Sequence, residues 1–267
     1  MIIVLLLGLT VGVILALTGA GGGILAVPLL VFGVGLSMAE AGPIGLLAVG
    51  LAATLGAVMG LKNGTVRYKA ALLIAGAGIV CSPLGLWLAQ RTPNRPLTIM
   101  FAIVLMYVAF RVYQRSLACS SESKPPVTSK PPPCQLDVNR GKLNWTRPCA
   151  WALTVSGIVA GGLSGLLGVG GGFVMVPALQ RYTNLTAQSV LATSLAVIAL
   201  VSISGVAASS ATGHLQWAVA IPFSIGALAG MICGHLVAAK LSGPNLQKGF
   251  AIVSAVVAVA LLVKAIR

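Results

Sequence analysis

Two runs of glycine, set in an otherwise apolar sequence, are the residues best suited to binding chemistry. Each run shortly precedes a Val-Pro pair, whose proline is Pro28 in the first case and Pro177 in the second. Glycines at the start of a short helix let a ligand approach the backbone, because no Cβ atom stands in the way. The free N–H groups and positive dipole end of such a helix attract anions. We therefore predict an anion site at six glycines: Gly21, Gly22, Gly23, Gly170, Gly171 and Gly172.

Polar side chains after the second run supply further candidate contacts. Gln188, Thr193 and Ser194 lie in the next apolar segment, and we predict that they line the site and orient the substrate. Hydroxyls in apolar helices more often bond to their own backbone, which is what we expect of Thr54 and Ser202. The predicted site therefore depends on neutral groups, with no metal and no cofactor.

Glu40 is the one carboxylate next to a predicted membrane segment. At the start of a segment it is expected to cap a helix N-terminus, and the alternative is a role in proton coupling. Carriers driven by H⁺ or Na⁺ usually hold Asp or Glu within the membrane. Export of an anion from a negative-inside cell needs no coupling, because the potential contributes about 2.3 kcal/mol per charge per 100 mV. The scarcity of carboxylates therefore favours uncoupled anion export.

The elements that must position these residues are predicted from an internal repeat. A shift of 149 residues aligns the two halves without a gap, so that Gly8 falls on Gly157 and Gly12 on Gly161. These four glycines are spaced for close helix packing. Each half contains five apolar segments: about 1–18, 24–36, 41–61, 70–90 and 96–114, then about 149–167, 173–180, 187–211, 217–239 and 246–266.

The second segment of each half is too short to cross a membrane. Residues 173–180 make about 12 Å of helix, whereas the hydrocarbon core is about 30 Å thick. Broken backbone at that depth must be buried in protein or line a cavity. We predict an all-α integral membrane protein with two homologous, inverted halves, each with a Gly-rich broken or re-entrant helix hairpin plus three membrane helices. Its parts are a first repeat (1–114), a Pro/Ser-rich basic linker (115–147) and a second repeat (148–267).

The composition excludes a soluble enzyme, a disordered protein and a nucleic-acid-binding protein. Apolar residues make up 58% of the chain and charged residues only 7%, whereas soluble domains are about 25% charged. The mean hydropathy is +1.02 and the formal net charge is +14. The chain must therefore lie mostly in the lipid bilayer, and its positive charge should mark cytoplasmic loops. The composition permits a homo-oligomer without indicating one.

The basic residues favour inverted halves with a cytoplasmic linker. Inversion places 13 of the 17 Lys and Arg residues on the linker side, in loops around residues 62–69, 111–147, 181 and 240–248. A parallel arrangement with four crossings per half places 12 on one side and 5 on the other, so the totals alone do not decide. The loop with Lys62, Arg67 and Lys69 aligns with residues 212–218, which contain no Lys or Arg. Parallel halves would place both loops in the cytoplasm, so this difference supports inversion.

The five cysteines form no Cys-x-x-Cys pair, which argues against a metal site or a disulfide framework. Cys119, Cys134 and Cys149 are evenly spaced by 15 residues in or beside the linker. No histidine clusters with them to complete a metal site. We interpret these three cysteines as incidental.

The sequence resembles the TauE/SafE family of sulfite and organosulfonate exporters. The resemblance rests on the doubled Gly-x-Gly-Gly-Gly-x-x-x-Val-Pro pattern, at residues 19–28 and 168–177. The stretch Gln-Ser-Val-Leu-Ala-Thr-Ser-Leu at 188–195 and Gly-His-Leu-Gln-Trp at 213–217 also fit the family. The resemblance covers nearly the whole chain. It implies a multi-pass protein of the cytoplasmic membrane that exports sulfite, sulfoacetate or a related anion. The inverted repeats with broken helices predict that this export proceeds by alternating access. The first half departs from the pattern, with Ile44-Gly45 in place of Thr193-Ser194.

Two other functions fit parts of the sequence. One is an anion channel or a permease for another small anion. The other is an intramembrane serine protease, because Ser164 lies in a Gly-x-Ser-Gly pattern and His235 lies in a later membrane segment. The repeat argues against the protease, since the residues aligned with the serine pattern carry no nucleophile.

Overall fold

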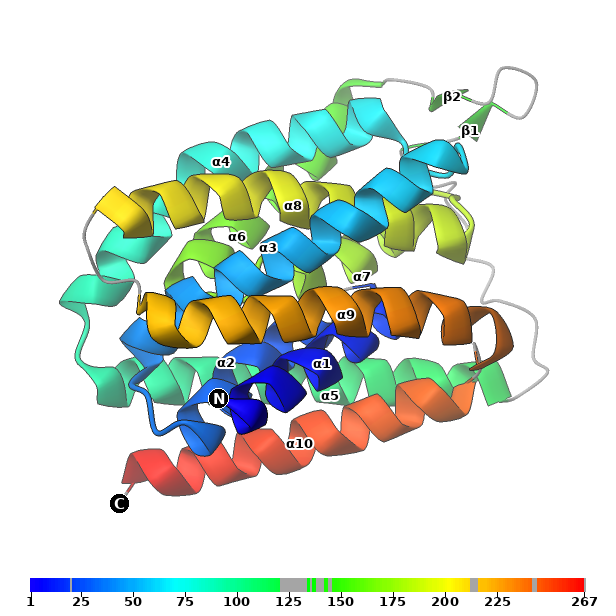
Figure 1. The fold of residues 1–267 in the computed structure, drawn as a ribbon. Helices are drawn as coiled ribbons and strands as arrows, with labels where there is room; N and C mark the ends of the chain where they lie inside the picture. Colours follow the sequence, from blue (N-terminus) through cyan, green and yellow to red (C-terminus); the bar gives the residue numbers. More distant parts are fainter. Residues whose placement is uncertain are drawn as a thin grey trace.

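The computed structural model describes residues 1–19, 21–120, 134, 136–137, 142–143, 146–211, 216–241 and 244–266. Over these residues the chain forms ten α-helices and one pair of two-residue strands (Figure 1). The first half contains α1 (Ile2–Thr18), α2 (Gly21–Gly33), α3 (Met38–Lys62), α4 (Tyr68–Arg91) and α5 (Asn94–Ser120). The second contains α6 (Arg147–Leu167), α7 (Gly172–Tyr182), α8 (Ala187–Ala211), α9 (Trp217–Leu241) and α10 (Pro244–Ile266). Between the halves, β1 (Leu136–Asp137) pairs antiparallel with β2 (Lys142–Leu143).

The predicted helical membrane architecture is confirmed. Every helix begins within three residues of its predicted segment. Within the described ranges, six helices are long and apolar enough to cross a membrane, namely α3, α4, α5, α6, α8 and α9. Large apolar side chains such as Leu84, Trp151 and Leu236 are exposed on these helices. Such a surface requires lipid, so the chain is a multi-pass membrane protein.

Both short helices belong to antiparallel hairpins. Helix α2 turns back along α1, because Gly22 packs on Leu15 near the end of α1 and Gly33 packs on Leu7 near its start. Helix α7 turns back along α6, so that it ends close to the first turn of α6. Each predicted broken segment is therefore a helical hairpin whose tip lies inside the protein.

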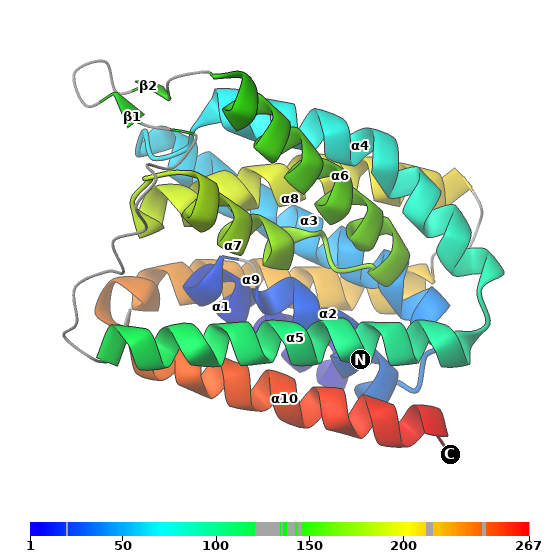
Figure 2. The same cartoon turned by 180° about the vertical axis from the view of Figure 1, so that it is seen from behind.

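The helices pair across the two halves in an equivalent way. Helix α1 packs on α9, and its counterpart α6 packs on α4. Helices α3 and α8 pack on each other, as do α5 and α10. The sequence colours in Figures 1 and 2 show that the members of each of these two pairs run in opposite directions. The long interfaces therefore join one half to the other.

The paired glycines allow two of these interfaces to close. A methyl group on Gly8 or Gly12 would collide with the carbonyl oxygens of Phe223 and Ala227 in α9. In the second half, Gly161 packs directly on Gly78 in α4. The prediction that these glycines serve close helix packing is confirmed, since the helix backbones touch where a Cβ atom is missing.

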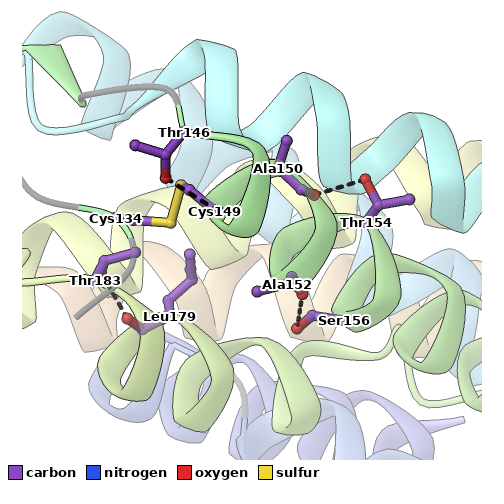
Figure 3. The surroundings of a disulfide bond; sticks show 9 residues. All are labelled: Cys134, Thr146, Cys149, Ala150, Ala152, Thr154, Ser156, Leu179 and Thr183. Carbon is purple, nitrogen blue, oxygen red and sulfur yellow. Dashed lines mark hydrogen bonds between the residues drawn. A yellow bond between two sulfur atoms is a disulfide. The ribbon is translucent and has the colours of Figure 1, made fainter. Parts of the chain in front are cut away.

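The interpretation of the linker cysteines as incidental is wrong for two of the three. Cys134 and Cys149 form a disulfide (Figure 3). The N–H of Cys134 also donates to the carbonyl oxygen of Tyr182 at 3.1 Å. Even spacing in the sequence could not reveal this, because Cys134 contacts both the first turn of α6 and the end of α7. The side chain of Cys119 lies outside the described residues.

Candidate functional site

Two helix breaks form the centre of the candidate site. Helix α1 ends at Gly19 and α6 at Gly168, both with φ of 71°. In the second break, Gly170 and Gly171 also have positive φ, of 78° and 67°. Side chains rarely tolerate this region, so glycine is required for the chain to turn so sharply. Ala20 in the first break lies outside the described residues.

The two breaks lie against each other. The space that a Cβ atom of Gly23 would fill holds the carbonyl oxygen of Val169. Gly23 is in the first turn of α2, and Val169 lies in the break before α7. The N-terminal ends of both short helices therefore approach one region, and no side chain caps α7. Uncapped first-turn N–H groups are free to bind an anion.

Helices α3 and α8 enclose the breaks in matching positions. Gly168 packs on Gly42 of α3, and Gly19 packs on Leu191 of α8. These contacts are equivalent under the 149-residue shift. Each break is therefore covered by the long helix of the other half.

The structure does not bring the three predicted polar side chains together. The hydroxyl of Ser194 lies 2.8 Å from the carbonyl oxygen of Leu191 and 3.2 Å from that of Gly19, so it is engaged at the first break. Thr193 accepts a hydrogen bond of 3.1 Å from the N–H of Arg67, in the loop before α4. Gln188 is exposed in the first turn of α8.

The two prolines loosen the short helices near their starts. Pro28 and Pro177 lie inside α2 and α7. Proline has no N–H, so the carbonyl four residues earlier lacks its helical partner. Those residues are Ile24 and Phe173, in the first turns of α2 and α7. The prolines thus act on the backbone next to the breaks.

An apolar cavity of about 10 Å³ lies beside the breaks. Its lining comes from the short helices, α5, the end of α6 and the second break: Ile24, Phe101, Val104, Leu105, Val108, Leu167, Val169 and Phe173. This volume is about that of a single water molecule. The cavity is therefore too small to hold a polyatomic anion.

Glu40 forms a capping box at the start of α3. Its carboxylate accepts the N–H of Ser37 at 3.0 Å and the Ser37 hydroxyl at 2.7 Å. The Gln216 side-chain amide donates to its other oxygen at 3.0 Å. Every partner is a donor, so the ionised form satisfies all the contacts. The structure thus gives Glu40 the capping role expected from its position.

The residues of the protease alternative do not meet. Ser164 is fully buried in α6, and its hydroxyl has no hydrogen-bond partner within the described residues. His235 is exposed on α9. A Ser–His pair must lie within hydrogen-bond reach for the base to activate the nucleophile. The geometry therefore gives no support to a nucleophilic site.

Comparisons with known proteins agree with the membrane architecture. The model of the sulfite exporter TauE/SafE family matches residues 4–261. A probable membrane transporter protein of Xylella fastidiosa (strain Temecula1) is 27% identical, over 95% of this chain and 90% of its own length. The probable membrane transporter protein YunE of Bacillus subtilis is 25% identical, over 90% of this chain and 89% of its own. No solved structure matches significantly. This chain therefore belongs to the sulfite exporter TauE/SafE family of membrane transporters.

Proposed function

We propose that this transporter exports a small organosulfur oxyanion, such as sulfite or sulfoacetate, across the cytoplasmic membrane. The observation that carries the proposal is the meeting of the two helix breaks at Gly23 and Val169. It directs two helix N-termini to one region. Backbone N–H groups at Gly21–Gly23 and Gly170–Gly172 then attract the anion.

Alternating access between inverted halves is the proposed mechanism. Equivalent helices α5 and α10 run in opposite directions side by side, which supports inversion (Figure 2). In transporters of this kind the substrate lies at the interface of the repeats, near the midplane. The small size of the apolar cavity supports an occluded conformation, from which each hairpin opens toward its own side of the membrane.

Anion flux in proteoliposomes tests this function. Sulfite, sulfoacetate, sulfate and chloride are compared under an imposed membrane potential, with and without a pH gradient. We expect the flux of sulfite and sulfoacetate to saturate and to show counterflow. We also expect this flux to accelerate when the membrane potential drives anions outward. Flux that neither saturates nor shows counterflow would indicate an anion channel. An absence of flux for both sulfite and sulfoacetate would contradict the proposed substrate class.

Glu40→Gln is expected to leave this flux unchanged in the absence of a pH gradient. The amide retains one acceptor oxygen, so the cap is weakened by about 1 kcal/mol and the melting temperature falls slightly. Ser37→Ala is the matched control, because it removes the same cap and keeps the carboxylate. A different outcome is that flux depends on a pH gradient in the wild type and in Ser37→Ala but not in Glu40→Gln. That outcome would show that Glu40 couples transport to protons.

If the linker is cytoplasmic, we expect Cys134 and Cys149 to be reduced thiols, with no disulfide between them, in growing cells. The 13 basic residues on the linker side favour this orientation, and the cytosol keeps thiols reduced. In a variant with Cys81, Cys119 and Cys233 replaced by serine, both remaining thiols should react with a polyethylene-glycol maleimide after acid quenching. The bond should form only after extraction and air oxidation. A disulfide in the quenched cells would place the linker on the opposite face.

A further inference from the structure

Three buried serines lie on helices that pack on one another around the second hairpin. Ser82 of α4, Ser164 of α6 and Ser202 of α8 are exposed by no more than 1%. Within the described chain, none of their hydroxyls has a hydrogen-bond partner. The three helices pack on one another in pairs. Ser224 and Ser254 are also unpartnered, but they lie on α9 and α10, away from this group of helices.

Other serines on the same helices behave differently. The hydroxyl of Ser156 in α6 lies 2.7 Å from the carbonyl oxygen of Ala152, and that of Ser209 in α8 lies 2.8 Å from that of Gly205. Bonding to the carbonyl one turn back is the usual way a hydroxyl is satisfied inside a membrane helix. A buried hydroxyl without any partner costs free energy. The three unpartnered hydroxyls therefore call for an external acceptor.

Ser202 points at the break before α7. A methyl group on Gly170 would lie 3.7 Å from the Ser202 hydroxyl oxygen, and one on Gly50 would lie 3.2 Å from it. The hydroxyl thus sits between two residues without side chains. Gly170 immediately precedes the uncapped N-terminus of the 11-residue helix α7. The unpartnered Ser202 hydroxyl and the N-terminus of α7, which attracts anions, therefore both face the region beside Gly170.

Ser82 of α4 lies against α8 one turn from Ser202, and Ser164 lies next to a close contact between α6 and the Ser82 backbone. A methyl group on Gly205 would lie 3.2 Å from the Ser82 hydroxyl oxygen, and Gly205 is one turn after Ser202 on α8. Gly165, next to Ser164, packs on the backbone carbonyl of Ser82. Sequence reasoning did not single out Ser82. The signal was present in the alignment of the halves, where Ser82 falls on an apolar residue.

The equivalent place in the first half carries no hydroxyl. Under the 149-residue shift, Ser82, Ser164 and Ser202 correspond to Met231, Leu15 and Ala53. These three residues are also exposed by no more than 1%. Gly56 contacts the methyl end of Met231 just as Gly205 faces Ser82. Apolar side chains therefore fill the same packing positions, so packing alone does not require serines.

We propose that Ser82, Ser164 and Ser202 form a subsite for the oxygen atoms of the transported oxyanion, on the second hairpin only. The proposal rests on the proposed function. Each hydroxyl donates to one oxygen, while the first-turn N–H groups of α7 bind from the helix end. The first hairpin contributes an apolar wall in the equivalent place. The substrate class is an oxyanion, because several acceptor oxygens on one ligand can each accept from one hydroxyl.

Ser202→Ala tests the proposal in proteoliposomes with sulfite as the probe. We expect the KM for sulfite to rise about 10-fold or more, because one donor to the anion is lost. The melting temperature should stay the same or rise, because an unpaired hydroxyl is removed. Ala53 already occupies the equivalent position, so alanine fits the space. Ser82→Ala should shift KM in the same direction.

Ser209→Ala is the matched control, because it removes a hydroxyl from the same helix that already bonds to its own backbone. Its KM should equal that of the wild type. An unchanged KM in both Ser202→Ala and Ser82→Ala, with saturable wild-type flux, would overturn the subsite alone. Absence of saturable wild-type flux for any oxyanion would overturn the subsite and the proposed function together.

Discussion

Gly171→Ala is expected to reduce saturable anion flux about 100-fold or more, while the protein still inserts in the membrane. Gly171 has φ of 67°, a region that costs a residue with a side chain about 1–2 kcal/mol. The new methyl group would also lie 2.5 Å from the carbonyl oxygen of Ala160. That oxygen belongs to the backbone of α6, so the break itself has to shift. A displacement of about 1 Å at a reacting or binding centre can cost about 100-fold.

Two further variants separate the causes of this loss. Gly162→Ala is the control, since no atom lies within 4 Å of the added methyl group, and its flux should match the wild type. Gly171→Asn should lose flux like Gly171→Ala, because asparagine tolerates positive φ but keeps the Cβ collision. Insertion is checked by size-exclusion chromatography of the detergent extract. If a correctly inserted Gly171→Ala protein has wild-type flux, the second helix break is not part of the anion site.

Gly161→Val is expected to lower the melting temperature by roughly 5–10 °C, the largest stability effect among these changes. Gly161 packs directly on the Cα atom and carbonyl oxygen of Gly78. A valine side chain would force α4 and α6 apart along one of the longest interfaces of the molecule. The measurement is thermal unfolding of the detergent-solubilised protein.

The neighbouring residue provides the control for this change. Gly162→Val adds the same side chain one position later, where a Cβ atom meets nothing within 4 Å. The first half already has valine there, since Gly162 corresponds to Val13. Its melting temperature should stay within about 2 °C of the wild type. If Gly161→Val and Gly162→Val lower the melting temperature equally, added volume rather than contact with Gly78 controls stability.

The helices were predictable because their signals are local in the sequence. The length of each apolar segment defined the long helices, and the glycines at 170–172 located the second break. The capping role of Glu40 was also readable, because its partner Ser37 is three residues away. Each of these features depends on neighbours along the chain.

The roles of the polar side chains were not predictable, because their partners come from the other half. Thr193 is engaged by a residue 126 positions away, and Ser194 by one 175 positions away. The spacing of Thr193 and Ser194 says nothing about which backbone group lies opposite. The disulfide was missed for a similar reason, since the fold of the linker, rather than the spacing of its cysteines, brings Cys134 to Cys149.

The pairing of α1 with α9 has a consequence for synthesis. Gly12 and its contact Ala227 are separated by 215 positions, so at about 5–20 residues per second the ribosome needs roughly 10–40 s to supply the partner. During that time the glycine face of α1 remains uncovered. Helix α6, by contrast, emerges when α4 is already in place. The second hairpin therefore docks first, and α1, although it is translated before its partner α9, is among the last helices to reach its native position.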